Sequence, residues 1–388
     1  MNAERGYMDS KDYNEDLEYL YSELLRHPLF LEDEKKKRNF EELYLSVKEK
    51  ELEYDSFLDT ATELTLFFQD GHTNIELPYT SQDRCVRLRC CWNEADCREL
   101  VLTECYEDIP EHAQILKVEG MTVPELILLF ADRIPHENIY LVKSRMIRYP
   151  YQNYHVFSEM NLKKMFGGKE NYRITFLVDG EIVNKEIPLV SYDGFLDFVS
   201  DDEFLTYKVM DDVVILHLKQ CIYNERYKQI LRELAQICNE QDIRTFVLDL
   251  SSNMGGDSSV IDEFIQYTRV KNYRRYEMID YSSGKAVKRT SREEQVGNLQ
   301  QEWLFPEDIR CIVSHNTFSS ARTFAVTLKD NGIARIYGSE TGGRPSSYGL
   351  PRRMHLPKTN IRFRVSRCRF LRPDADRDDE ITLRPETK

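Results

Sequence analysis

A serine in the last third of the chain is the first residue that could carry chemistry. Ser319 lies in a polar turn between an apolar run at 309–313 and a helical pattern that stops near Gly332. A hydroxyl at a strand-to-helix turn lies at the positive end of the helix, where a developing oxyanion is stabilised. Ser319 is therefore a candidate nucleophile. The local pattern also fits a helix N-cap at Thr317, Ser319 or Ser320.

Two further segments supply groups that a serine nucleophile needs. His72 lies in the turn Asp70-Gly71-His72-Thr73, and an imidazole can take a proton from a serine hydroxyl. Gly255 and Gly256 follow a predicted strand at 244–250 and allow backbone N–H groups to turn toward a substrate carbonyl. Each segment also has a purely structural interpretation: His72 as a histidine in a turn, and Gly255-Gly256 as a glycine-rich loop without a role in catalysis. His315 is a weaker candidate base.

Three regions with different patterns of apolar residues must position these groups. Residues 8–70 show apolar positions at helical spacing, and residues 85–190 read as short strands with one helix, a small α+β module. An Asp-Gly pair at 179–180 predicts a tight hairpin there. From residue 204 strands alternate with helices, which predicts a largely parallel sheet covered on both faces. Functional sites in such sheets lie at the carboxyl ends of the strands.

Composition excludes several classes of function. The chain has 388 residues, 41% apolar and 31% charged content and a net charge of -14, typical of a globular protein and unfavourable for binding nucleic acid or an anionic membrane. No stretch approaches the roughly 20 apolar residues of a membrane span. The N-terminus resembles no signal peptide, so we expect a cytoplasmic protein, or a secreted or envelope protein if a leader was removed.

Cysteine spacing predicts no metal site. Nine cysteines are present, and no pair has metal-ligand spacing with another cysteine or a histidine. We expect reduced thiols and no metal. Five of the nine are close together: Cys85, Cys90, Cys91, Cys97 and Cys105.

The segments together resemble the tail-specific, or C-terminal processing, protease family, the S41 serine peptidases. The resemblance rests on four motifs in order: the 70–73 turn, the strand and loop at 248–256, Ser319 with a helix that ends Asp-Asn-Gly, and Glu340-Thr341-Gly342-Gly343-Arg344. It implies an α/β fold with a ClpP/crotonase-like core sheet, an N-terminal helical segment and a PDZ-like α+β insert. The implied domains are 1–78, 79–195 and 196–388.

Matching the motifs position by position implies roles for individual residues. The nucleophile is Ser319, and the position of the processing branch's lysine base falls on Arg344, which stays protonated and cannot act as a base. The resemblance is therefore to the tricorn-like branch, in which His72 is the base. It implies an oxyanion hole formed by Gly255, Gly256 and the Ser320 N–H, and neither a metal nor an organic cofactor.

The sequence departs from the family at the residues around this pair. Ser251 replaces the usual arginine, Arg322 replaces a glutamate, and the orienting glutamate expected within 367–374 is missing. Asp70 or Glu340 could orient His72 instead, or the site is a Ser-His dyad.

The resemblance implies a serine-type endopeptidase, a hydrolase whose partners are peptides or unfolded proteins held as an added strand by the PDZ-like insert. The alternative is a binding protein with a disabled site, similar to retinoid-binding relatives of the family. A third reading is an esterase or a narrow aminopeptidase. The oligomeric state stays open.

Overall fold

The N-terminal part of the chain forms a helical layer. The computed structural model describes residues 8–48, 50–93, 98–148, 151–192, 203–297 and 301–386. Asp9 caps the first helix in a reciprocal capping box with Asp12. The predicted helical periodicity is confirmed, and the buried side chains of these helices share one hydrophobic cluster. The helices are α1 (Ser10–Leu24), α2 (Leu29–Glu32), α3 (Glu34–Val47) and α4 (Tyr54–Leu66).

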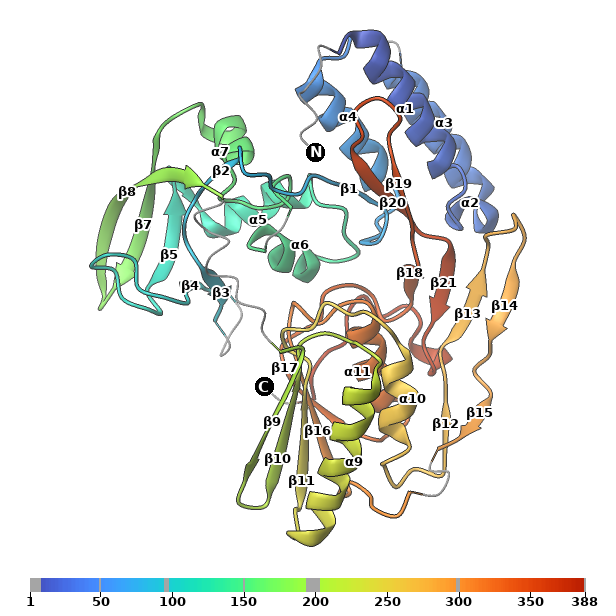
Figure 1. Ribbon diagram of the computed structural model, residues 1–388. Coiled ribbons are helices and arrows are strands. Elements are labelled where there is room, and N and C mark those ends of the chain that lie inside the picture. Colours follow the sequence, from blue (N-terminus) through green and yellow to red (C-terminus); the bar gives the residue numbers. More distant parts are fainter. Residues whose placement is uncertain are drawn as a thin grey trace.

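A small sheet built from both ends of the chain closes this cluster. Strand β1 (Asn74–Glu76) pairs with β20 (Arg362–Val365), which pairs with β19 (Arg352–His355), all antiparallel. Ile75, Phe363 and Val365 are buried against the helices. The helical layer is therefore completed by residues almost 300 positions downstream, beyond the predicted boundary at residue 78 (Figure 1).

The middle of the chain forms a second body with its own core. Its sheet has the order β2-β8-β7-β5-β4-β3, with β6 paired to β5. The Asp-Gly hairpin is confirmed: Asp179 and Gly180 have φ of 50° and 85° between β7 and β8. The likeness to a PDZ domain stays a prediction. The elements are β2 (Arg84–Val86), β3 (Cys90–Trp92), β4 (Leu100–Leu102), β5 (Gln114–Val118), β6 (Met121–Thr122), α5 (Val123–Ala131), α6 (Ile139–Met146), α7 (Glu159–Phe166), β7 (Asn171–Val178) and β8 (Glu181–Ser191).

The last part of the chain forms a five-stranded sheet of order β17-β16-β11-β10-β9. Four strands are parallel and β9 is antiparallel to β10, so a largely parallel sheet is confirmed. The strands are β9 (Leu205–Met210), β10 (Val213–Leu218), β11 (Thr245–Asp249), β16 (Asp308–Val313) and β17 (Arg335–Gly338), and the helices are α9 (Glu225–Glu240), α10 (Ser259–Ile265) and α11 (Ser320–Asp330).

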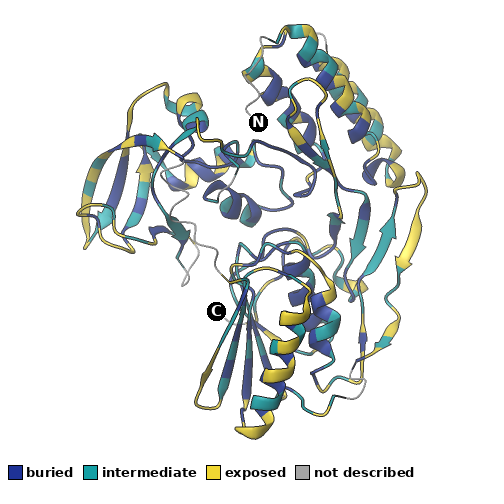
Figure 2. Cartoon of the chain, in the orientation of Figure 1, coloured by how far each residue is buried: buried dark blue, intermediate teal, exposed yellow. Residues whose placement is uncertain are grey.

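The prediction that helices cover both faces of this sheet is wrong. The three helices lie on the same side of the strands in Figure 1. Crossovers between parallel strands are right-handed, and β10, β11, β16 and β17 are added in one direction, so each helix falls on the same face. Residues of β10 and β16 accordingly alternate between buried and half-buried (Figure 2).

Two further sheets connect the core to the helical layer. The polar segment after residue 272 contains a hairpin, and β13 of this hairpin also pairs with β21. Among the described residues no helix is long and apolar enough to cross a membrane. Eight described cysteines are free thiols, and Cys97 lies outside the described residues. The remaining elements are β12 (Asn272–Arg274), β13 (Glu277–Asp280), β14 (Val287–Thr290), β15 (Glu294–Val296), β18 (Ser347–Gly349), β21 (Cys368–Leu371) and the 3-10 helix η1 (Ala375–Arg377).

Candidate active site

Ser319 occupies a strained turn between β16 and α11. Its φ of 52° and ψ of -126° lie in a region that residues with a side chain seldom adopt. The packing of Gly255 explains how the turn is held: a Cβ there would lie 2.7 Å from Ser319 Cβ and 2.9 Å from Ser320 N. Only a glycine allows the loop to approach this closely. The turn lifts the Ser319 hydroxyl out at the N-terminus of α11.

The turn between α4 and β1 brings His72 to this hydroxyl. His72 Nε2 and Ser319 Oγ are 3.0 Å apart, although the two residues come from opposite ends of the chain. The imidazole stacks on Phe318 with ring centroids 4.6 Å apart, and it is 7% exposed. The predicted pairing of nucleophile and base thus has hydrogen-bonding geometry, and Phe318 fixes the plane of the ring.

Asp70 builds the turn that carries His72. Its carboxylate is fully buried and accepts hydrogen bonds from the His72 N–H at 2.9 Å, Thr73 Oγ1 at 2.7 Å and Ser366 Oγ at 2.6 Å, and it lies 3.2 Å from His27 Nε2. Burial alone would raise the pKa of this carboxyl, but its interactions with His27 and His72 outweigh burial and hold the pKa well below its usual range. Asp70 therefore stays ionised beside the imidazole.

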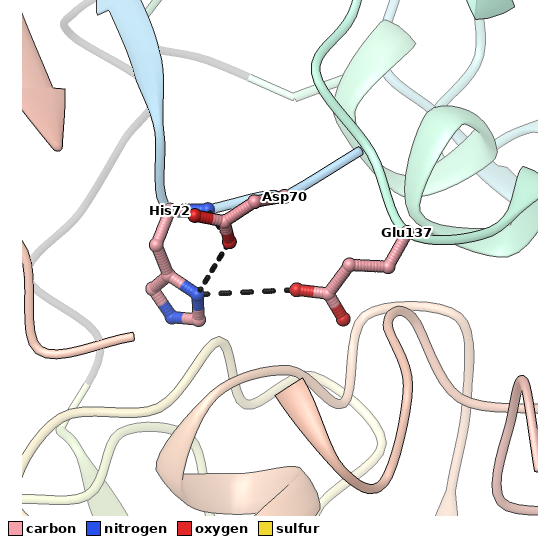
Figure 3. Close-up of side chains that lie close together, drawn as sticks. All are labelled: Asp70, His72 and Glu137. Atoms are coloured by element: carbon pink, nitrogen blue, oxygen red, sulfur yellow. Dashed lines mark hydrogen bonds and ion pairs between the residues drawn. The ribbon is translucent and has the colours of Figure 1, made fainter. Parts of the chain in front are cut away.

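A second carboxylate, Glu137, reaches the imidazole from the middle body. Figure 3 shows His72 Nδ1 directed toward both carboxylates, 3.6 Å from Asp70 Oδ1 and 4.0 Å from Glu137 Oε1. Nδ1 itself has no hydrogen-bond partner among the described residues. Of the two orienting acids expected from the sequence, Asp70 is at the site, whereas Glu340 interacts with Tyr140 and forms no ion pair with His72.

Arg322 explains why Glu137 is held here. The guanidinium is 2% exposed and lies 3.1 Å from Glu137 Oε2, and it donates a second hydrogen bond to Ser347 Oγ at 2.7 Å. A buried cation requires a partner, and the arginine on the first turn of α11 obtains it from the middle body. Sequence reasoning missed Glu137; the unusual charge at position 322 was the one signal of a missing partner.

The loop at 341–344 is fixed to the same segment. Asn138 Nδ2 donates to the carbonyl oxygens of Thr341, Gly343 and Ile381, and Glu137 Oε2 accepts from the Arg344 N–H at 2.6 Å. The Arg344 side chain is exposed. In the processing branch this loop would carry a lysine base. Here its backbone N–H at Arg344 instead donates a hydrogen bond that holds Glu137 in place.

The three predicted oxyanion donors have different surroundings. The Gly255 N–H donates to Asn253 Oδ1 at 2.8 Å, so it is engaged inside its own loop, and its role in the oxyanion hole stays a prediction. The Ser320 N–H is the first of α11 and has no acceptor within the helix. The Ser320 hydroxyl donates to the Gly256 carbonyl at 2.7 Å, which ties the glycine loop to the helix. Roles for Gly256 and Ser320 in the oxyanion hole stay predictions.

Asp70, His72 and Glu137 also have the donor atoms of a cation site. One ligand atom from each lies within 4.8 Å of the others, the one such group in the described residues. The Asp70 carboxylate already accepts several hydrogen bonds, and Glu137 is paired with Arg322. The two carboxylates are therefore committed to interactions within the protein.

Comparison with solved structures shows which fold the chain has. The fold is similar to that of mature CPAF complexed with lactacystin (TM-score 0.69, 12% identity, 98% of this chain and 94% of that chain), and of the photosystem II D1 C-terminal processing protease (0.51, 13%, 97% and 92%). A putative peptidase from Parabacteroides merdae is also similar (0.51, 12%, 98% and 90%). At these identities the likeness shows the fold, and the predicted α/β fold is confirmed, whereas the PDZ-like character of the insert stays a prediction. No curated protein sequence matches the chain.

The family follows from the sequence itself. Residues 212–379 match the model of peptidase family S41, so this part of the chain is an S41 peptidase domain, as the sequence motifs predicted. The match supports a peptidase function with peptide substrates.

Proposed function

We propose that the protein is a serine-type endopeptidase in which Ser319 is the nucleophile and His72 the general base. The observation that carries the proposal is the 3.0 Å separation of His72 Nε2 and Ser319 Oγ at the carboxyl edge of the sheet. His72 Nε2 takes the hydroxyl proton as Oγ attacks the scissile carbonyl, and then returns it to the leaving amine. The Ser320 N–H is the donor that we assign to the oxyanion.

Glu137 and Asp70 together take the part of the orienting acid. In the tautomer in which Nε2 accepts a proton, Nδ1 carries a hydrogen and requires an acceptor. Asp70 Oδ1 at 3.6 Å and Glu137 Oε1 at 4.0 Å flank that hydrogen, and both carboxylates stabilise the imidazolium that forms during attack. Such contacts are often long without substrate and tighten in the complex.

The alternative of a binding protein with a disabled site is not favoured. A disabled site would lack the nucleophile, the base or their contact, and here both side chains are within hydrogen-bonding distance. Binding of an extended peptide by the middle body and a cytoplasmic location remain predictions.

A fluorophosphonate probe, which reacts with activated serines, tests the proposal. We expect the wild-type protein to be labelled, Ser319→Ala to abolish labelling and His72→Ala to reduce it by about 10²-fold or more. Ser283→Ala is the matched control, because it removes an exposed hydroxyl in the turn after β13 and should be labelled at the wild-type level. Labelling of Ser319→Ala to the wild-type level, or no labelling of a folded wild-type protein, would overturn the assignment.

A further inference from the structure

The charge of the chain is distributed unevenly around the site. Residues 341–373 contain nine lysines and arginines and no aspartate or glutamate, in a chain whose net charge is -14. This segment includes the 341–344 loop and the strands β19 and β20. A local excess of positive charge in an acidic protein attracts anionic ligands to that face.

Four of these nine cations, counting Arg364, form ion pairs with acids elsewhere in the chain. Arg372 lies 2.6 Å from both Asp330 and Glu380, Lys358 contacts acids of α1, and Arg352 lies 3.8 Å from Glu23. The other five form no ion pair with an acid among the described residues, and two of these five lie on the strands β19 and β20. Arg353 and Arg362 are exposed, and neither forms an ion pair with any acid among the described residues. Their charges face outward from the sheet.

The small sheet β1-β20-β19 gathers these side chains on one face. Its other face packs on the helical layer, and because side chains alternate along a strand, the arginines lie on the opposite side. Arg353 is opposite Arg364 in the register, and Arg362 lies between Glu76 and His355. Glu76 is the single acid, and it is paired with Arg364. Together they line a cavity of about 130 Å³, whose walls are Glu76, Tyr151, Arg353, Met354, His355, Arg362, Phe363 and Arg364.

The cavity is connected to the catalytic turn. Arg364 Nε donates to Asn74 Oδ1 at 3.4 Å, and Asn74 Nδ2 donates to the Gly71 carbonyl at 2.9 Å, next to His72. Only Asn74–Glu76 of this segment is extended, so at about 3.3 Å per residue the chain from His72 to Glu76 spans at most roughly 13 Å. A peptide that runs from Ser319 along β1 would place a side chain about two to four residues from the scissile bond at the cavity.

We propose that this cavity, the arginine pocket, is a specificity subsite that binds an acidic side chain of the substrate. The inference rests on the proposed peptidase function. A volume of about 130 Å³ suits one side chain and is too small for a drug-sized ligand. Arginine binds carboxylates through paired, charge-assisted hydrogen bonds, and Arg353 and Arg362 have donors available for them. A C-terminal carboxylate carries the same chemistry, and the test separates the two sources.

The test begins with a mixed peptide library, in which mass spectrometry locates the bonds that the wild-type protein cleaves. We expect aspartate or glutamate to be enriched within about four residues on one side of the cleaved bond. A cleaved sequence is then synthesised with glutamate or glutamine at that position, each as free acid and as C-terminal amide. A preference for glutamate in both forms assigns the pocket to a side chain, whereas a preference for the free acid alone overturns this assignment in favour of the C-terminus.

Variants connect the preference to the pocket. The double variant Arg353→Gln/Arg362→Gln should lower the glutamate-to-glutamine ratio of kcat/KM by about three- to tenfold, the range for two partly exposed charge pairs, and 0.5 M salt should lower it in the wild type. Arg269→Gln is the matched control, because Arg269 is an exposed arginine of the α/β core, and it should keep the wild-type ratio. Arg362→Glu should favour a lysine at the same position.

The outcomes distinguish the subsite from the proposed catalysis. Fluorophosphonate labelling of the double variant should equal that of the wild type, because the pocket does not touch Ser319. Wild-type protein that is labelled and cleaves peptides without an acidic preference, or a double variant that keeps the preference, overturns the subsite alone. Folded wild-type protein that is not labelled overturns the proposed function, whatever peptides bind.

Discussion

Replacing Gly255 by alanine tests how the nucleophile turn is held. An added Cβ would lie 2.7 Å from Ser319 Cβ, 2.9 Å from Ser320 N and 3.0 Å from the Phe318 carbonyl oxygen. All three atoms belong to the turn itself, so the strain falls on the residue that carries the hydroxyl. Gly255 also has a φ of 105°, which adds backbone strain to any side chain.

Backbone strain and overpacking together set the expected loss in the free energy of unfolding. A positive φ costs a residue with a side chain about 1–2 kcal/mol, and overpacking a close contact costs about 1–3 kcal/mol more, so we expect the free energy of unfolding to fall by about 2–5 kcal/mol. Relief of a contact near 2.7 Å requires a shift approaching 1 Å, and misplacement of that size lowers the rate by about 10²-fold. The added Cβ also lies against Ser320 N, the assigned oxyanion donor. Loss of one such donor lowers the rate by about 10²–10³-fold.

Gly180→Ala is the matched control. Gly180 has a φ of 85° in the β7–β8 hairpin, and nothing lies within 4 Å of the Cβ that alanine would add. It should lower the free energy of unfolding by only about 1–2 kcal/mol and leave the rate unchanged. The assays are urea unfolding followed by circular dichroism, and the rate of fluorophosphonate labelling of folded protein. If Gly255→Ala were labelled at the wild-type rate while folded, the close approach of the loop would have no part in holding Ser319.

Two further predictions concern buried charge. Glu137→Gln leaves the Arg322 cation buried without its ion-pair partner, so we expect the free energy of unfolding to fall by about 3–5 kcal/mol. We also expect kcat to fall while KM changes little. The double variant Glu137→Gln/Arg322→Met should recover stability but not kcat, and recovery of both would refute an orienting role. Burial lowers the pKa of His155 and of His315, the latter also through the Lys143 charge, from 6.5 to about 3 in each case. Because the unfolded chain binds these protons and the folded chain does not, their contribution to stability is complete above pH 6.5 and is lost toward pH 3, at up to about 1.4 kcal/mol per pH unit for each histidine. Urea midpoints at pH 7, 6 and 5 should show this slope and a shallower one for His155→Gln; equal slopes would mean that His155 is not buried in its neutral form.

Much of the architecture is readable from local patterns. The helical periodicity before residue 70, the Asp-Gly hairpin and the alternation of strands and helices after residue 204 each depend on residues that are close in sequence. The covering of the core sheet is different, since it depends on the order in which strands join the sheet. Composition and periodicity do not contain that order, and the expectation of two covered faces failed for this reason.

The sequence by itself determined the candidates for nucleophile and base, because Ser319, His72 and Gly255 lie in short motifs whose spacing is visible along the chain. Only the tertiary structure decided what surrounds them. Glu137 belongs to no motif. It lies beside His72 because, from the middle body of the chain, it forms an ion pair with the buried Arg322. The arginine pocket likewise exists because β20 pairs with β1, which follows the catalytic turn. Such contacts depend on the packing of segments that are distant in sequence. Burial determines which charges need an ion-pair partner, and the local sequence pattern does not show which residues become buried.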